Sequence, residues 1–201
     1  TMLALQTELN SHIWVAPNGD ASRARKITTG TGAYDEVCFT PDGKIVYASQ
    51  ASGTWDIWTM NADGSEPKQL TVDAGVNVGP TITPDGQFIL FTSSRDGASH
   101  IWKMNRDGSE VVRLTEGSGE RFPQVSPDGK WVVYGVVGTN DEFLSLWKVP
   151  LEGGAAVRLT ASQASRPAVS PDGKWVAYFG YQENLNSPSK LVVIPFAGGE
   201  P

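Results

Sequence analysis

The sequence predicts an all-β protein built from a repeated four-stranded antiparallel unit, because three short phrases recur along the chain in a fixed order. The first is Ser/Thr-Pro-Asp-Gly, whose prolines stand 43 or 44 residues apart at Pro41, Pro84, Pro127 and Pro171. The second is an Ile/Leu-Trp pair, whose tryptophans stand 44 or 45 residues apart at Trp14, Trp58, Trp102 and Trp147. The third is an Ile/Leu-Thr pair, at residues 27–28, 70–71, 114–115 and 159–160. A four-stranded unit of this length is typical of a β-propeller blade.

Each repeat divides into four strands. The first strand ends at the Pro-Asp-Gly turn, as in "PQVS" before Pro127, and the second follows it, as in "KWVVYGV". The third strand carries the Ile/Leu-Trp pair, and the fourth ends in Leu-Thr. Alternating apolar and polar residues, with many β-branched and aromatic side chains, predict strands, and no segment has a convincing helical period.

The turns and the tryptophans have structural explanations. Ser/Thr-Pro-Asp-Gly fits a type I turn, in which proline presets φ and glycine takes the positive φ that follows. The turns "NADGSE" and "NRDGSE" reverse the chain between the third and fourth strands, and one Asp in each is too few for a calcium loop. The repeated tryptophans, with Trp131 and Trp175, are expected to pack between neighbouring blades.

The repeats predict a single domain over residues 1–201. The expected division is a partial blade at 1–28, complete blades at 36–71, 79–115 and 123–160, and a partial blade at 166–201. These make about four and a half blades, and the partial blades cannot merge because both contain second and third strands. We therefore expect a piece of a larger propeller of about six blades or more. Unpaired strands at its edges would favour self-association.

Composition argues against several classes of protein. The net charge is −6 and the sequence pI is about 4.9, with no run of basic residues, so a nucleic-acid partner is not expected. No apolar stretch is long enough to span a membrane, and the first residues lack the features of a signal peptide. The single cysteine, Cys38, cannot form an internal disulfide and is expected as a small buried residue on an innermost strand.

No arrangement for catalysis, for a metal or for a cofactor is found in the sequence. The two histidines, His12 and His100, stand just before the Ile-Trp pair, where the other repeats have Asp56, Ser145 and Lys190. A position that accepts such different side chains is not a shared catalytic or metal-binding position. Neither a G-x-S-x-G motif nor a phosphate-binding glycine motif occurs.

These phrases together resemble the TolB-like, or WD-repeat-like, propeller family, whose repeat carries a "SPDG" corner, an Ile-Trp strand, an "xDGS" turn and a Leu-Thr end. The likeness covers nearly the whole chain. The segment "LALQTELNSHIWVAPNGDASRARKIT" is also similar to propellers attached to bacterial serine/threonine kinases and winged-helix regulators. The first resemblance implies protein–protein interaction outside the cytoplasm, in the periplasm or at the outer face of a bacterial membrane. The second implies signal sensing.

The predicted binding site lies at the mouth of the central channel. In a four-stranded meander the regular turns fall on one face of the disc and the irregular loops on the other, where function concentrates. The residues just before each innermost strand should surround the channel mouth. They are Tyr34, Asp35, Glu36, Asn77, Arg121, Phe122 and Arg166. Arginine and aromatic residues are favoured in protein-recognition patches, although the charged members could equally pair with one another or solvate the rim.

The function that follows is a non-catalytic module that binds a protein or peptide, as a sensor or scaffold within a larger bacterial signalling protein. One alternative is the gating propeller of a prolyl-oligopeptidase-like serine peptidase, whose nucleophile would lie in sequence after Pro201. Another is a carbohydrate-binding propeller, for which Trp55 is the best candidate because it lies in a loop outside the common tryptophan position.

Overall fold

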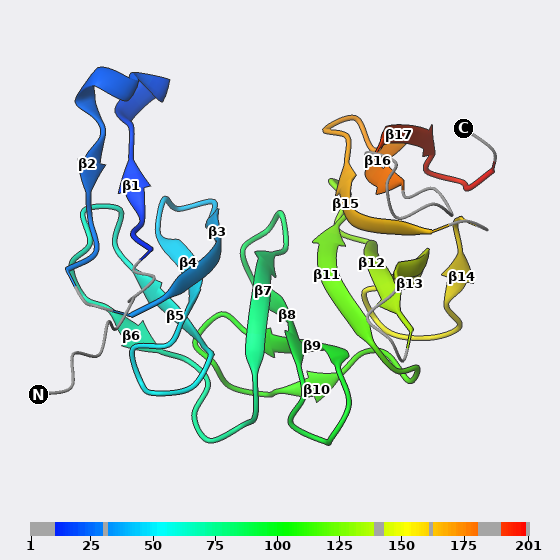
Figure 1. Ribbon diagram of the computed structural model, residues 1–201, viewed down its shortest axis with the longest axis horizontal. Coiled ribbons are helices and arrows are strands. Elements are labelled where there is room, and N and C mark those ends of the chain that lie inside the picture. Colours follow the sequence, from blue (N-terminus) through cyan, green and yellow to red (C-terminus); the bar gives the residue numbers. More distant parts are fainter. Residues whose placement is uncertain (1–10, 30–31, 139–142, 161–162, 181–189, 200–201) are drawn as a thin grey trace, which may run out of the picture.

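The computed structural model describes residues 11–29, 32–138, 143–160, 163–180 and 190–199. Within these ranges the chain forms five antiparallel sheets, each made of strands that are consecutive in the sequence. Figure 1 shows the sheets arranged around a shared hollow, in an open arc with the first and last sheets at its two ends. Helix is limited in these ranges to two single 3-10 turns, so the structure confirms the predicted all-β propeller architecture.

We number the sheets as blades in chain order. The first blade has β1 (Trp14–Val15) and β2 (Arg25–Lys26), joined through the 3-10 turns η1 (Pro17–Gly19) and η2 (Ala21–Arg23). The second has β3 (Tyr34–Phe39), β4 (Ile45–Ser49), β5 (Asp56–Met60) and β6 (Lys68–Gln69). The third has β7 (Asn77–Ile82), β8 (Phe88–Ser93), β9 (His100–Asn105) and β10 (Val112–Arg113). The fourth has β11 (Glu120–Val125), β12 (Trp131–Val137), β13 (Phe143–Pro150) and β14 (Val157–Arg158). The fifth has β15 (Ala164–Val169), β16 (Trp175–Gly180) and β17 (Lys190–Pro195).

The Ser/Thr-Pro-Asp-Gly phrase forms the same hydrogen-bonded turn in four blades. In the fourth blade the Gly129 N–H donates to the carbonyl of Ser126 at 2.8 Å, as a type I turn requires. The Ser126 hydroxyl donates to the Asp128 carboxylate at 2.6 Å and accepts the Trp131 N–H at 3.0 Å. This bond from Ser126 is the main reason why the pKa of Asp128 is lowered. The phrase is therefore a structural corner between the first two strands.

The hydrophobic core is divided into four clusters, each located between two neighbouring blades. Ile57 and Phe91, for example, meet between the second and third blades, and Leu146 and Ile194 between the fourth and fifth. All four of these residues are fully buried. Each blade thus buries its faces against its neighbours, as expected of a repeat protein.

The tryptophan prediction is confirmed for the inner blades and wrong at the ends of the arc. Trp58, Trp102 and Trp147 pack against the clusters between blades. Trp14 on β1 is 60 % exposed and Trp175 on β16 is 48 % exposed. Both lie in the end blades of the arc, where only one face of the sheet has a described neighbouring blade. A side chain on the other face therefore has no described blade to pack against.

The turn between the third and fourth strands also joins neighbouring blades. A Cβ atom at Gly64 would run into the carbonyl oxygen of Ile27, in the preceding blade. At Gly108 it would lie 3.0 Å from the carbonyl oxygen of Leu70, and at Gly198 it would lie 3.5 Å from the Leu159 side chain. In these three blades the turn glycine therefore allows close contact with the end of the preceding blade's last strand.

Candidate functional site in the central hollow

Each innermost strand of the second to fifth blades contains a β-bulge. The pairing of the first two strands shifts by a residue between Asp35 and Val37 in β3, and at the matching place in β7, β11 and β15. One residue at each bulge has a positive φ. These residues are Glu36 (36°), Gly79 (65°), Phe122 (59°) and Arg166 (50°), which we call the bulge ring. A bulge changes the direction in which a side chain points, and bulges are common beside functional sites.

The bulge ring carries a conformational cost in three of its four members. A side chain at positive φ costs of order 1–3 kcal/mol, and such residues cluster at sites where function requires them. Glu36, Phe122 and Arg166 are an acid, an aromatic residue and a base, so no single side-chain preference explains the repeated conformation. What they share is their place in the repeat, on strands that line the hollow (Figure 1).

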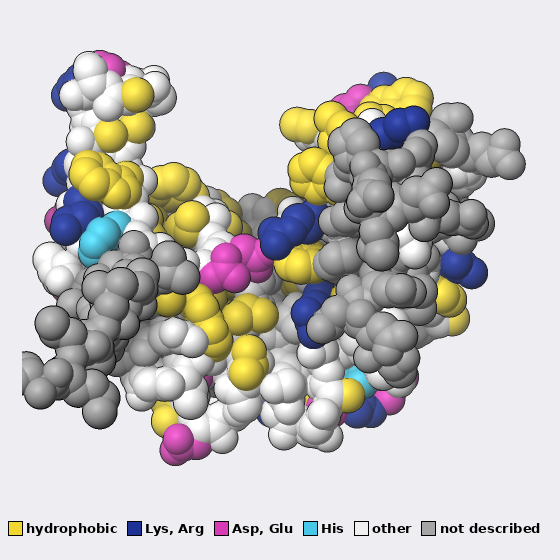
Figure 2. Space-filling model, viewed as in Figure 1, with side chains coloured by type: hydrophobic (Ala, Val, Ile, Leu, Met, Phe, Trp, Pro, Cys, Tyr) yellow, Lys and Arg dark blue, Asp and Glu magenta, His cyan; other side chains and the backbone are white. Residues whose placement is uncertain are grey.

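The bulge-ring side chains contact one another across the hollow. The Arg166 Nη1 atom lies 3.8 Å from the Glu36 Oε1 atom, which joins the fifth blade to the second. The Arg166 guanidinium carbon also lies 4.6 Å from the centre of the Phe122 ring, within range of a cation–π interaction. Figure 2 shows acidic and basic side chains meeting in the middle of the hollow.

Gly79, the fourth member of the bulge ring, has no side chain and so leaves room for the Glu36 carboxylate. A Cβ atom at this position would lie 2.6 Å from the Glu36 Oε2 atom, so any other residue would displace that carboxylate. Beside it a cavity of about 270 Å³ is lined by Glu36, Gly79 and Phe122, together with Cys38 and Gln124. The four positions are therefore fitted to each other around a small concave surface.

Burial changes the acid–base properties of two groups at this surface. The pKa of Glu36 is raised, mainly by burial and also by the neighbouring charge of Asp35, while Arg166 acts in the opposite direction. Burial raises the pKa of the Cys38 thiol to about 11. Cys38 is therefore a thiol rather than a thiolate at neutral pH, and it is a poor nucleophile in this state.

The seven residues predicted for the channel mouth fall into two groups. Glu36, Phe122 and Arg166 belong to the bulge ring. Asp35 is exposed next to Glu36, whose N–H it accepts at 3.0 Å, and Arg121 is half-buried next to Phe122 on β11.

Tyr34 and Asn77 lie instead between blades. The Tyr34 ring packs against Tyr47 with ring centres 5.9 Å apart. The Asn77 side chain is fully buried and donates to the Asp56 carboxylate at 3.2 Å. Both are the first residue of an innermost strand, where the side chain points into the neighbouring blade rather than into the hollow.

Sequence reasoning missed Gly79, although a signal for it exists. Three bulge-ring residues directly precede a proline, in "GP" at 79–80, "FP" at 122–123 and "RP" at 166–167, with the spacing of the turn prolines. The surface thus offers an ion pair, an aromatic ring and backbone groups, which are the contacts of noncovalent recognition. Within the described ranges, no group of three or more His, Cys, Asp or Glu side chains is placed to hold a metal ion.

The whole-chain comparison places these features in a family. Residues 7–198 match the family described as TolB beta propeller domain. A curated relative, an uncharacterized protein of Agrobacterium fabrum, is 33 % identical over 98 residues, which span 48 % of this chain and 33 % of the relative. The match thus spans about one third of that protein's length. In the described ranges, no helix combines the length and apolar character needed to cross a membrane.

Solved structures share the fold. A structure assigned to TolB from Agrobacterium tumefaciens has a TM-score of 0.77 at 23 % identity, over 88 % of this chain and 67 % of that one. TolB from Acinetobacter baumannii has a TM-score of 0.77 at 24 % identity, over 90 % of this chain and 46 % of that one. A more distant oligogalacturonate lyase in complex with manganese has a TM-score of 0.66 at 14 % identity, over 86 % of this chain and 50 % of the lyase. At these identities the likenesses establish the fold alone.

Proposed function

This chain belongs to the TolB beta propeller domain family, and from that premise we propose that it is a non-catalytic module that recognises a protein or peptide through the bulge ring. The observation that carries the proposal is the bulge at the same place in four innermost strands, which directs Glu36, Phe122 and Arg166 into one hollow. Positive φ recurs at four equivalent positions, three of them not glycine, and such strain is expected where a surface is shaped for binding. Charged and aromatic groups beside a small cavity suit the side chains of a peptide.

The Arg166–Glu36 pair gives the proposed site a way to respond to its ligand. Both side chains are partly exposed, at 58 % and 28 %, so their interaction is weakened by water. A carboxylate of a partner could replace Glu36 as the neighbour of Arg166, and the two nearby cations, Arg121 and Arg166, would favour such a partner electrostatically. We therefore propose that the recognised segment carries an acidic group.

The test is a selection of peptides from a displayed library on the wild-type chain, followed by affinity measurements on variants. Arg121→Ala combined with Arg166→Ala should weaken the selected peptides about tenfold or more. Arg106→Ala is the matched control, because Arg106 lies in a third-to-fourth-strand turn and pairs with Asp42 on the face of regular turns. Equal affinity of wild type and the double variant would contradict the proposal.

By the same family membership we propose that the module acts outside the cytoplasm, within a bacterial signalling or envelope protein. Fractionation of the natural host, with detection of the tagged protein, tests this placement. Recovery in the cytoplasmic fraction alone would overturn it.

A further inference from the structure

A recurring notch lies between neighbouring blades, at the outer side of each core cluster. We define it by three positions, which are the first residue of the innermost strand, the aromatic residue of the second strand and the tryptophan of the third. Between the second and third blades these are Asn77, Phe91 and Trp102. Between the third and fourth they are Glu120, Tyr134 and Trp147. The matching positions allow the occupants of the two notches to be compared.

An arginine of the chain fills the notch between the second and third blades. The Arg95 guanidinium carbon lies 4.7 Å from the centre of the Trp102 ring and 5.2 Å from that of Phe91. Arg95 also donates to the Asn77 Oδ1 atom at 3.2 Å and to the Ser93 hydroxyl at 3.1 Å. Planar guanidinium groups stack on aromatic rings while their edges donate hydrogen bonds, so this side chain fits both the walls and the base of the notch.

A buried acid lies beneath Arg95. The Asp56 side chain belongs to a residue that is 1 % exposed, and it accepts hydrogen bonds from Asn77 at 3.2 Å and from Thr71 at 2.8 Å. The notch therefore combines aromatic walls, a polar atom at the base and a buried carboxyl group. Arginine suits all of these features, because its guanidinium group stacks on aromatic rings, donates hydrogen bonds and carries a positive charge.

The notch between the third and fourth blades has the same walls without that arginine. Gly138 takes the place of Arg95. Phe91 and Tyr134 are matching residues of the second strand, and Arg95 and Gly138 each lie four residues after them. The equivalence is supported by backbone bonds, since Ser94 donates to Val76 at 3.1 Å and Val137 donates to Gly119 at 2.8 Å. In the described part of the chain the space forms a cavity of about 610 Å³, lined by Glu120, Tyr134 and Trp147 among others.

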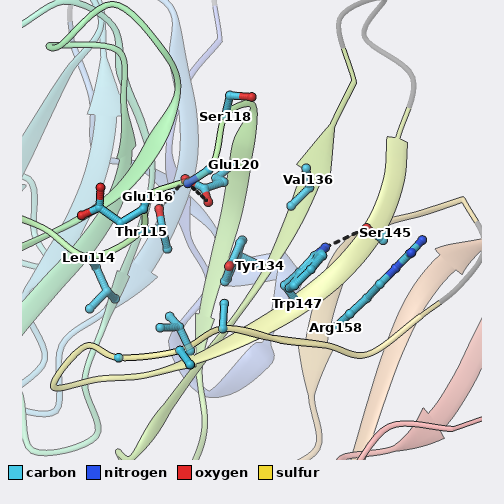
Figure 3. A pocket seen from close by; sticks show the side chains of 15 residues that line it. Leu114, Thr115, Glu116, Ser118, Glu120, Tyr134, Val136, Ser145, Trp147 and Arg158 are labelled. Carbon is cyan, nitrogen blue, oxygen red and sulfur yellow. Dashed lines mark hydrogen bonds between the residues drawn. The ribbon is translucent and has the colours of Figure 1, made fainter.

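Figure 3 shows how the side chains surround this cavity. Glu120 and Thr115 lie on one side, Trp147 lies on the other with Ser145 and Arg158, and Tyr134 lies between them. Arg158 is at the edge, where its Nε–H donates to the carbonyl of Thr160 at 2.7 Å.

The acid of this notch is Glu120, which is 3 % exposed. One carboxylate oxygen is bonded by the Thr115 hydroxyl and lies 2.9 Å from His100 Nδ1, and the other accepts the Gly117 N–H at 3.0 Å. A carboxylate can accept about four hydrogen bonds, so a further donor from the cavity can be accommodated. In the other notch the buried acid, Asp56, belongs to the preceding blade, whereas here the buried acid, Glu120, belongs to the following blade.

We propose that this cavity binds an arginine side chain of a protein partner, stacked on Trp147 and Tyr134 and paired with Glu120. Lysine lacks the planar group that stacks along two rings. A leucine would fill the apolar part but would cover a buried carboxylate without donating to it, which is unfavourable. This site is separate from the bulge ring, so either proposal can fail without the other.

The test follows the indole N–H signal of Trp147 by NMR in the full chain, assigned by its loss in Trp147→Phe. This N–H donates to the Ser145 hydroxyl at 2.8 Å, at the cavity, and so reports on the site itself. The probe is acetyl-Gly-Arg-Gly-amide, and the controls carry citrulline or leucine instead of arginine. The arginine peptide should give a saturable shift. The citrulline and leucine peptides should bind at least about tenfold more weakly, because citrulline keeps the shape of arginine and loses its charge.

Variants provide a second, independent measurement. Gly138→Arg places an arginine where blade three has Arg95 and should abolish the response, whereas Gly138→Ala should preserve it. Arg95→Gly should create a new, arginine-dependent response at the Trp102 indole. Thermal unfolding of each variant checks that it is folded. Equal responses to arginine, citrulline and leucine would overturn the proposal, as would an unchanged response in folded Gly138→Arg.

Discussion

At the residue scale, the bulge ring shows how side chains of different chemistry use one backbone conformation. Glu36, Phe122 and Arg166 have positive φ values although none is a glycine, while Gly79 has the same conformation and leaves room for the Glu36 carboxylate. Fit between neighbours, rather than a shared residue type, holds the ring together. Two predictions test this fit, one through charge and one through space.

Glu36→Gln should stabilise the protein at neutral pH but not in acid. The raised pKa means that the folded state binds a proton at Glu36 more tightly than the unfolded state does. That contribution is fully present below the ordinary pKa of about 4.5 and is lost as the pH rises through the folded pKa. Glutamine removes the loss, so the Tm should rise by a few degrees at pH 7 and remain nearly unchanged at pH 4.

Thermal melts at the two pH values measure this difference. Glu152→Gln is the control, because its side chain is 84 % exposed. A gain of the same size at pH 4 and pH 7 would contradict the explanation by burial.

Gly79→Ala should destabilise the protein for two reasons. A left-handed conformation costs alanine about 1–2 kcal/mol, and its Cβ atom would lie 2.6 Å from the Glu36 Oε2 atom. Gly43→Ala isolates the first cost, since Gly43 has a φ of 84° and no atom within 4 Å of its Cβ position. Urea unfolding should rank Gly79→Ala as the more harmful change, and adding Glu36→Ala should bring its cost down to that of Gly43→Ala.

At the element scale, the period of the repeat was sufficient to predict the strands and their turns. The Ser/Thr-Pro-Asp-Gly turn has the same bond from the glycine N–H to the Ser/Thr carbonyl in all four copies, and this bond depends only on residues within the turn. The bulges could not be predicted in the same way. The sequence predicts Asn77 just before an innermost strand, at the channel mouth, but it is the first residue of β7 and its side chain is buried between blades. An inserted residue breaks the two-residue alternation of a strand, so the faces on the two sides of a bulge do not follow from one count.

Ser126→Ala should destabilise the fourth blade by about 1–2 kcal/mol, because the hydroxyl both donates to Asp128 and accepts the Trp131 N–H. Denaturant unfolding measures the loss. The exposed Ser118→Ala is the control and should be neutral. Similar stability of the two variants would mean that water replaces the Ser126 bonds at no cost.

At the scale of the whole molecule, stability is distributed over the interfaces between blades. Each core cluster contains residues of two adjacent blades, so neighbours depend on one another far more than on distant blades. The contact between Arg166 and Glu36 is an exception that crosses the hollow, and it depends on the curvature of the arc rather than on sequence proximity. The sequence suggests that charged residues at the channel mouth could pair with one another, but no local pattern identifies Arg166 and Glu36 as the partners.

Leu146→Ala should loosen the fourth and fifth blades and leave the second and third nearly unchanged. Leu146 is 0 % exposed in the fourth–fifth cluster, and removing such a side chain costs about 2–5 kcal/mol. Amide hydrogen exchange, resolved by blade, measures the effect. Met104→Ala, in the second–third cluster, should give the reverse pattern. Uniform loss of protection in both variants would instead indicate that the arc unfolds as one unit.

The turn glycines determine how tightly one blade can close on the next. Gly64 and Gly108 bring their turns against the main chain of Ile27 and Leu70, whereas the corresponding Gly153 of the fourth blade has no atom within 4 Å of its Cβ position. The fourth blade's turn thus lacks, at Gly153, the close contact with the preceding blade that Gly64, Gly108 and Gly198 make at the other three joints, and the large cavity lies at this joint. A side chain bound in this cavity would contact both blades, so binding would stabilise their position relative to each other.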